Sequence, residues 1–571
     1  MLTSTITGVR AGRGFFVGFL TDNITLDYSL IFNTAIVWFF CFLISLLFLG
    51  VYLRVVLFVV VLLCYIFLLT TLFLANTSIS DFTETNVIEW FNLEKGATIF
   101  FTLTSNFYSN EFSFILIFLA LTIHLYSFFY FKKDPDFSRF TVLIGFFLFF
   151  MLLLINTGSW VFLFVSWEGV GFLSFMLVSF WYSKINTFKS GIKVLLYNRV
   201  GDFFFFLSIG LIEHFTKTDS VINSDYVLHV LGGFSLNSNN VVFIDFLVGA
   251  GLTLVLLSKS AQFGFHVWLL EAMEAPLPAS SLIHSATLVC AGVVLFFKSF
   301  GFIMYISHLG SFIVFWASLT ACFLSFSALL NYDIKKILAY STGSHVSLML
   351  VLSISGGGSL GYAYTLMHAS TKVFIFLLFG FIIDVNQGVR DIRKMGGFFR
   401  FQHITYYGFF SIATLSSLPF FPLALLKDTA GIHLLSGNFI GDFSLVLLML
   451  ATLFNYMYMF RLFFKIFFGD LLGNNSVYFN YFFVFYKFIG VSFKSGTSRI
   501  FNNPLIVLFL FCFFFEVLVF VALSMDYGFS ENRILNVEVF LPQNSVYNYL
   551  AISNSMFFFF IFLRAYYKLF R

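Results

Sequence analysis

The chain contains 571 residues, of which 60% are hydrophobic and only 10% are charged, and its mean hydropathy is +0.96. A soluble globular protein of this length could not bury so much apolar surface. The net charge of +4, without a basic patch interleaved with aromatic residues, excludes a nucleic-acid-binding role. At about 20 residues per crossing, the apolar runs predict an all-α polytopic membrane protein with roughly 14–16 transmembrane helices.

The apolar runs also give the expected order of elements. Residues 77–110 mix β-branched and polar residues and are expected to form an extramembrane hairpin or loop, and residues 216–240 to form a polar loop. Helices are expected near 30–50, 52–76, 112–131, 141–156, 159–182, 190–215, 241–272, 279–302, 309–330, 336–355, 362–385, 404–434, 441–468, 477–491, 505–524 and 550–563.

One stretch, from Lys259 to Val293, carries ionisable groups and prolines inside long apolar sequence. A basic group at the centre of a bilayer costs roughly 2.5–3.5 kcal/mol on insertion scales, so its presence indicates a function. Irregular backbone at membrane depth is tolerated only against protein or water. We therefore expect the seventh helix to be broken after Lys259. The residues concerned are Lys259, His266, Glu271, Glu274, Pro276, Pro278 and His284.

A second helix, 404–434, is interrupted by Pro419 and Pro422 and carries Lys427 near the interruption. The two broken helices, seven and twelve, lie five helices apart. Broken helices in corresponding positions are typical of inverted repeats, in which the ion site lies at the breaks. The spacing fits two inverted five-helix repeats, although the pattern alone leaves an unrepeated bundle equally open.

Several ionisable side chains lie in or beside the expected membrane helices. Glu168 stands alone in SWEGVGF and needs a cationic partner to remain charged, and we favour Lys259. His368 and Lys372 are four residues apart and share a helix face. A chain of such groups is what proton translocation requires. The full set is Glu168, Asp202, Lys259, His266, His284, His368, Lys372, Lys427 and Asp428.

Other interpretations of these residues stay open. Asp202 follows Arg199 by three residues, so a local structural pair competes with a coupling role. His266 and His284 could be packing histidines held by hydrogen bonds. Lys298 stands near a helix end, where snorkelling to the membrane surface is the better explanation.

Two sequence patterns could be mistaken for cofactor sites. The segment GGGSLG, at 356–361, fits GxGxxG, yet it links two apolar helices and opens no βαβ unit. The five cysteines are isolated and form no CxxC, so iron–sulfur or zinc ligation is unsupported. We expect no cofactor and no metal in this chain.

Longer motifs carry a family resemblance. LFVSWEGVGFLSFMLVSFWY, LLYNRVGDFFFFLSIG, KSAQFGFHVWLLEAMEAPLPASSLIHSATLVCAGVVL, YDIKKILAYSTGSHVSLM, LMHASTKVFIFLLFG and DIRKMGG follow one another in this order. In them the chain resembles the chain 5 family of NADH–ubiquinone oxidoreductase, respiratory complex I, over about residues 100–470. WEGVG and NRVGD are typical of chain 5 among the antiporter-like chains.

The resemblance implies a core membrane-arm subunit that translocates protons while electrons pass from NADH to ubiquinone in other subunits. NADH, FMN, iron–sulfur clusters and ubiquinone are then expected in those other subunits. The expected partners are the other membrane-arm subunits, especially the neighbouring antiporter-like chain 4, and phospholipids such as cardiolipin. The expected location is the mitochondrial inner membrane, crossed many times, with the gene in the organelle.

The resemblance also implies an organisation and roles for single residues. The expected parts are 1–137 (helices 1–3 and the hairpin), 138–302 (a first antiporter-like half), 303–468 (a second half) and 469–571 (C-terminal helices with a short lateral segment). Matched motif by motif, the proton-translocating residues are Glu168, Asp202, Lys259, His284, His368 with Lys372 as a central relay, and Lys427 with Asp428 as an exit pair.

Three departures from the family are visible. Tyr364 stands where the family often has a histidine one turn before His368, and Leu269–Leu270 replace its Leu-Pro after the tryptophan. The segment 525–549 is shorter than the family's lateral helix, and Pro542 argues against its being one continuous helix. Two other functions compete: the large subunit of a Mrp-type sodium/proton antiporter, which usually has a longer C-terminal region, and a purely structural scaffold in the lipid.

Overall fold

The computed structural model describes residues 28–49, 54–78, 84–92, 98–105, 107–131, 134–216, 239–305, 307–400, 402–418, 421–435 and 439–469. The expected helices at 477–491, 505–524 and 550–563, the lateral segment 525–549 and most of the polar loop at 216–240 lie outside the described residues.

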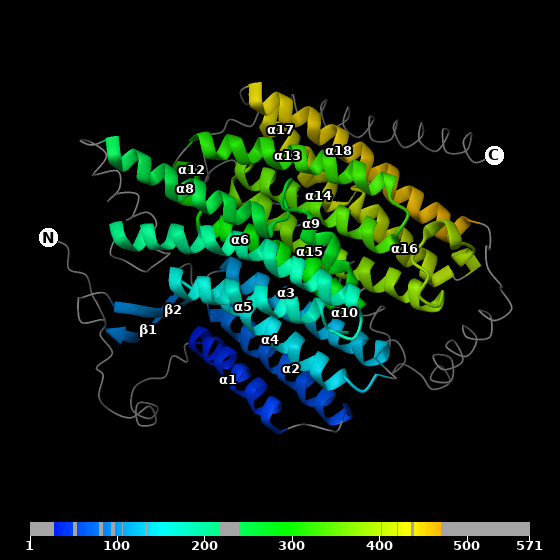
Figure 1. The fold of residues 1–571 in the computed structure, drawn as a ribbon, viewed down its shortest axis with the longest axis horizontal. Helices are drawn as coiled ribbons and strands as arrows, with labels where there is room; N and C mark the ends of the chain where they lie inside the picture. Colours follow the sequence, from blue (N-terminus) through cyan, green and yellow to red (C-terminus); the bar gives the residue numbers. More distant parts are fainter. Residues whose placement is uncertain are drawn as a thin grey trace.

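Long helices lying side by side make up most of the described structure (Figure 1). Among the described residues, nine helical segments are long and apolar enough to cross a membrane, which confirms an all-α polytopic membrane fold. The total number of helices and the boundaries of the four parts stay predictions. The helices are α1 (Tyr28–Leu49), α2 (Arg54–Ser78), α3 (Phe107–Tyr130), α4 (Phe137–Asn156), α5 (Trp160–Val178), α6 (Ile185–Thr216), α8 (Asn239–Lys259), α9 (Val267–Glu271), α10 (Leu277–Ser285), α11 (Leu288–Lys298), α12 (Phe300–Tyr305), α13 (Ser307–Leu330), α14 (Ile334–Ser355), α15 (Gly357–Val385), α16 (Gln402–Leu415), α17 (Pro422–Leu435) and α18 (Phe439–Phe463). Short turns of 3₁₀ helix cover η1 (Ala272–Glu274), η2 (Ile392–Lys394) and η3 (Phe398–Arg400), and a π-helical turn, η4 (Phe464–Phe468), follows α18.

A β-hairpin precedes α3, within the segment expected to be a hairpin or loop. Strands β1 (Glu84–Asn92) and β2 (Thr98–Ser105) pair antiparallel, with Glu84 opposite Ser105 and Asn92 opposite Thr98. The hairpin projects from one end of the helices (Figure 1), and Leu103 bridges to Thr157 in the α4–α5 turn.

Five helices, α4, α5, α6, α8 and α11, contribute to one small apolar cluster. Helix α6 packs against α5 and α8, and α11 packs against α8. Trp160, Trp167, Phe205, Leu252 and Leu295 are buried together there. Further along the chain, α13 packs between α14 and α18, and both α14 and α15 pack against α17 as well as against each other. These contacts place α5, α6 and α8 around one site and α14, α15 and α17 around another.

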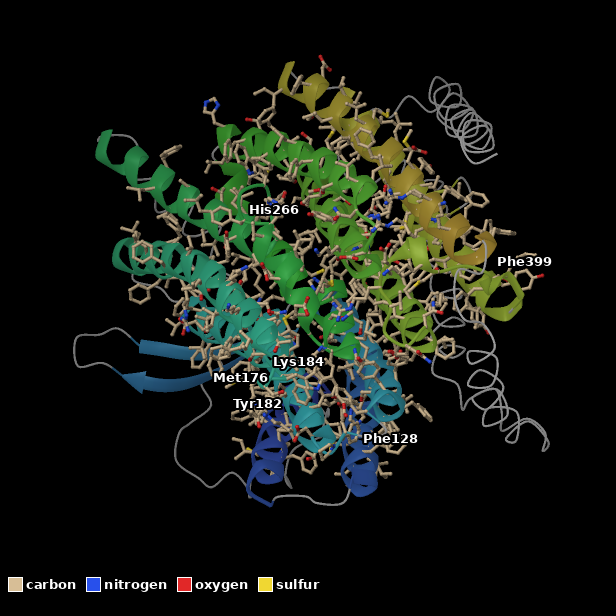
Figure 2. All side chains as sticks on the ribbon, turned by 45° about the vertical axis from the view of Figure 1, so that its right-hand side comes forward. Phe128, Met176, Tyr182, Lys184, His266 and Phe399 are labelled. Atoms are coloured by element: carbon tan, nitrogen blue, oxygen red, sulfur yellow. The ribbon has the colours of Figure 1, made fainter. Side chains whose placement is uncertain are left out.

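Aromatic and basic side chains mark one membrane surface, at the turn between α5 and α6. Tyr182 is 67% exposed, and the Arg139 guanidinium lies 5.5 Å from the centre of its ring. The Lys184 ammonium lies 4.7 Å from the Trp181 ring. Figure 2 shows Tyr182 and Lys184 close together in the lower part of the view. Such amphipathic rings and cations are enriched at the headgroup level of a bilayer.

The seventh helix is broken after Lys259, as the sequence predicts. Helix α8 ends at Lys259, and the chain then passes through left-handed backbone at Ala261 (φ 54°) and Gly264 (φ 94°) before α9 begins. Left-handed backbone interrupts a helix without proline, and glycine adopts it at no steric cost. The break therefore does not need the Leu-Pro that this chain lacks.

Side chains from other helices bind the carbonyl groups that this break frees. The Trp268 indole donates to the Ser258 carbonyl at 3.0 Å, and the Trp316 indole to the Phe263 carbonyl at 3.2 Å. Freed carbonyl groups in a membrane must find partners inside the protein. The break is thus a fixed feature of the fold.

The twelfth helix is broken in a similar way, between α16 and α17. Ser417 has left-handed backbone (φ 58°), while Pro422 begins α17 and Pro419 lies outside the described residues. The Asn455 amide on α18 donates to the Leu415 carbonyl at 3.0 Å, and the Tyr456 hydroxyl donates to the Ser417 carbonyl at 2.7 Å. Both breaks are confirmed, whereas the inverted repeat that they suggest stays a prediction.

The expected helix 279–302 is not continuous. It consists of α10, α11 and α12, and Thr287 between the first two has φ −121° and ψ −95°. The Thr287 hydroxyl donates to the Leu282 carbonyl at 2.8 Å. Short polar side chains that bind nearby backbone compete with helical hydrogen bonds, which explains an interruption without proline in SIHSATL. The interruption falls directly beyond His284.

Candidate functional site

Four charged side chains of alternating sign form a row across α5, α6 and α8. A Glu168 carboxylate oxygen lies 2.7 Å from Arg199 Nη1, and Arg199 Nη1 lies 3.8 Å from Asp202 Oδ2. Asp202 Oδ1 in turn lies 4.0 Å from Lys259 Nζ. The row runs from half-exposed groups, with Arg199 48% exposed, to an ammonium that is 1% exposed.

The glycines of the two motifs WEGVG and NRVGD allow the helices to approach this closely. A Cβ atom added at Gly171 would lie 3.0 Å from Lys259 Nζ, and one at Gly201 would lie 2.1 Å from Ser258 Oγ. Trp167 completes the site, because its indole donates to Asp202 Oδ1 at 2.9 Å. Its ring centre lies 5.1 Å from the Lys259 ammonium.

The prediction that Glu168 pairs with Lys259 is wrong. The structure pairs Glu168 with Arg199, and Lys259 with Asp202. The reason is geometric: Asp202 lies between Arg199 and Lys259 and takes the nearest position to the lysine. The local Arg199–Asp202 pair exists too, so this carboxylate belongs both to a local pair and to the buried row.

A second polar site lies between α14 and α15. The Lys372 ammonium donates to the Ser341 hydroxyl at 2.5 Å. His345 Nδ1 lies 2.6 Å from the Tyr364 hydroxyl, and the ring centres of His345 and His368 are 5.6 Å apart. All five side chains are buried.

His345 is a residue that the sequence reasoning missed. Tyr364, which stands in place of a family histidine, uses its hydroxyl to bind this second histidine. An imidazole is therefore present next to this position, but it belongs to His345 on α14 and not to α15. His345 shares a helix face with Ser341, four residues before it, but a serine in an apolar helix is no signal of a site, so this spacing does not single out the histidine.

Lys427 and Asp428 adjoin this second site from α17. Lys427 lies within electrostatic range of Lys372, His345 and Asp428. Its Nζ atom is buried and makes no hydrogen bond with the described residues. The predicted group of His368, Lys372, Lys427 and Asp428 is thus brought together.

His284 lies at the C-terminal end of α10, beside the unpredicted interruption. Its ring stacks near Phe376 at 5.9 Å, and it lies within electrostatic range of Lys372 and Lys335. No hydrogen bond joins His284 to Lys259 in the part of the chain that the structure describes. The His266 ring instead stacks on Phe263 and meets the Phe323 ring edge-on, on the upper side of the bundle in Figure 2, which is the environment of a packing side chain.

A further buried lysine, Lys335, was not predicted. Its ammonium donates to the carbonyl groups of Met273 and Ala275, at 3.2 and 3.1 Å, where the broken seventh helix ends. The two carboxylates of that break are in ion pairs: Glu271 with Lys193 at 2.5 Å and Glu274 with Arg390 at 3.6 Å. These four side chains are partly exposed, so their pairs contribute little to stability.

Broken membrane helices with buried charges at the breaks define an antiporter-like, multi-pass membrane protein. Residues 157–428 match the family model described as NADH:quinone oxidoreductase/Mrp antiporter, TM. NADH-ubiquinone oxidoreductase chain 5 of Paramecium tetraurelia is 32% identical over 397 residues, which cover 69% of each chain. The chain belongs to the family of NADH-ubiquinone oxidoreductase chain 5.

Other relatives agree with this family. Chain 5 of Acanthamoeba castellanii is 38% identical over 301 residues, covering 51% of this chain and 44% of that protein. NADH-quinone oxidoreductase subunit L of Rickettsia conorii is 32% identical over 436 residues, covering 74% and 63%. This chain therefore spans about half to two thirds of the length of several relatives. A structure of a Mrp complex from Dietzia sp. superposes with a TM-score of 0.67 at 18% identity, covering 92% of this chain and 60% of that one, and supports the fold alone.

Proposed function

We propose that this chain is a proton-translocating membrane-arm subunit of NADH–ubiquinone oxidoreductase in the mitochondrial inner membrane. Family membership supports the complex, and the charged row from Glu168 to Lys259 is the observation that carries the proton function. NADH, FMN, iron–sulfur clusters and ubiquinone belong to other subunits. An antiporter-like neighbour such as chain 4, and phospholipids such as cardiolipin, contact this chain.

The buried pair of Asp202 and Lys259 has the energy needed for a two-state device. Opposite charges 4.0 Å apart attract by about 4 kcal/mol at an effective dielectric constant of about 20. Moving one charge through 100 mV requires about 2.3 kcal/mol. Separating this pair therefore changes the free energy of the proton on Lys259 by at least as much as moving that proton through a membrane potential of about 100 mV.

The second site passes a proton among groups that cannot all be charged at once. Lys372 and Lys427 lie within electrostatic range of each other, so a proton on one disfavours a proton on the other. Ser341, His345, Tyr364 and His368 offer donors and acceptors around them. Asp428, beside Lys427, stabilises a proton that arrives there.

Sodium/proton antiport is the second candidate. The matching family model includes Mrp antiporters, and the fold matches a Mrp complex. The same buried lysines could then exchange protons against sodium without any redox reaction.

Purification of the native particle distinguishes the two functions. We expect a particle that contains flavin, oxidises NADH with a quinone acceptor and acidifies or alkalinises vesicles in a sodium-independent manner. A particle without flavin whose proton flux requires a sodium gradient would instead establish the antiporter.

A further inference from the structure

A cavity of about 540 Å³ lies at the end of the bundle opposite Tyr182 and Lys184. Helix α4 begins near Arg139, at the aromatic surface, and ends at Asn156, and Thr157 beyond it lines the cavity. Twenty helical residues span about 30 Å, the thickness of the hydrocarbon layer. The cavity therefore lies at the level of the other membrane surface.

The lining combines a broad apolar wall with one basic group. Phe112, Val294 and Phe297 contribute to the wall, and Lys298 lies at its edge. The Lys298 ammonium donates to the Thr157 carbonyl, which uses one of its three N–H groups. No carboxylate of the described residues forms an ion pair with it.

The position of Lys298, at the end of α11 and at the level of a membrane surface, is compatible with the snorkelling that the sequence suggests. Its ammonium donates to the Thr157 carbonyl, in the turn between α4 and α5, and both residues line the cavity. A partly buried ammonium in an apolar wall favours an anion nearby. Glu111 interacts with Tyr362 of the lining, and no interaction links this acid to Lys298.

A helix N-terminus provides the second favourable feature for an anion. Gly358 and Ser359, in the first turn of α15, line the same cavity. The first turn of a helix has N–H groups without helical partners and carries a partial positive charge. The GGGSLG segment therefore presents backbone without bulky side chains, at the membrane surface, next to a lysine.

We propose that this cavity binds one acyl chain of an anionic phospholipid, with the lipid phosphate at Lys298 and the first turn of α15. The volume falls in the range of roughly 300–1,000 Å³ that is usual for ligand sites. The apolar wall accepts the acyl chain, and the position at the end of the helices places the headgroup in the interfacial layer. An anionic lipid fits better than a zwitterionic one, because a choline cation would face both Lys298 and a helix N-terminus. The site does not depend on proton translocation.

Photocrosslinking tests the site in the native complex that contains this chain. The complex is reconstituted into phosphatidylcholine vesicles with a phosphatidylglycerol probe that carries a diazirine on one acyl chain. After irradiation, labelled peptides are mapped by mass spectrometry. We expect label on peptides from 108–112 and 290–300, displaced by unlabelled phosphatidylglycerol.

Two variants and one control make the test specific. Lys298→Gln keeps a donor for the Thr157 carbonyl but removes the charge, and we expect labelling about tenfold weaker, the factor for about 1.4 kcal/mol. Ser359→Asp, at an exposed position in the first turn of α15, adds a negative charge at the mouth and should weaken labelling without disturbing the core. Lys336→Gln, at an exposed lysine on α14, should leave labelling unchanged.

Four outcomes would overturn the proposal. The first is a phosphatidylcholine probe that labels the chain as strongly as the phosphatidylglycerol probe, and the second is undiminished labelling of both variants. The third is label found only on other peptides. The fourth is free palmitate that displaces the probe as effectively as phosphatidylglycerol does. The last result would assign the cavity to a fatty acid.

Discussion

Replacing Asp202 with Asn removes the buried carboxylate but leaves an oxygen that can accept the Trp167 indole bond. Lys259 then loses its nearest anion, 4.0 Å away, while its side chain remains 1% exposed. The lost attraction is about 4 kcal/mol at an effective dielectric constant of about 20, and breaking a buried pair generally costs about 3–5 kcal/mol. We expect Asp202→Asn to reduce assembly of the complex and to abolish most of its proton translocation.

A double variant separates the two effects. In Asp202→Asn/Lys259→Met no buried lysine charge is left unpaired, so assembly should recover relative to Asp202→Asn alone while translocation stays lost. Assembly is measured on native gels, and translocation by the quenching of a pH-sensitive dye in vesicles. Asp333→Asn is the control, because its pair with Lys336 is half-exposed at 3.6 Å and is worth about 0–1 kcal/mol. Normal translocation in Asp202→Asn, or a double variant no better assembled than the single one, would refute this reasoning.

Three further predictions concern the second site and its supports. Tyr364→Phe removes the hydroxyl bound to His345 and should destabilise the site by about 1–3 kcal/mol and slow proton translocation. Tyr364→His should retain activity, and equal translocation rates for the two variants would contradict this. Asn455→Leu leaves the Leu415 carbonyl at the second break without its donor and should lower the thermal midpoint of the complex, and an unchanged midpoint would show that the bond is dispensable. Asp391, in the loop after α15, has its pKa held below its ordinary value of 3.8 by the neighbouring arginine side chain. The contribution of Asp391 to loop stability is therefore present above that pH and lost as the pH falls through the lowered pKa. The Arg393 amide, which donates to Asp391, should then exchange its hydrogen faster, and Asp391→Asn should remove this pH dependence. Exchange of that amide that is insensitive to acid in the parent protein would disprove the prediction.

The broken helices were predictable because charged residues and prolines stand out in apolar sequence. Lys259 stands at the end of α8, where the expected break lies. Lys427 lies in the first turns of α17 beyond the second break. The third interruption, at Thr287, was not predictable from periodicity, because a single hydroxyl that binds nearby backbone does not alter the apolar pattern.

The partners of the charged residues were less predictable than the residues themselves. Glu168, Asp202 and Lys259 were identified because charges are rare in membrane helices, but three helices decide which of them meet. His345 cannot be singled out from the sequence, because it lies among serines in α14 and resembles an ordinary polar turn of a helix. Only the packing of α14 against α15 shows that its ring meets Tyr364.

The most direct test of the central claim is the number of protons translocated per NADH oxidised by the purified complex in vesicles. Lys259→Met should lower this ratio or stop coupled turnover, with the complex assembled and NADH oxidation by an artificial electron acceptor intact. Lys189→Met, at an exposed lysine of α6, should keep the parent ratio. An assembled Lys259→Met complex with the parent ratio and rate would contradict the account, because the buried row would then play no part in moving protons.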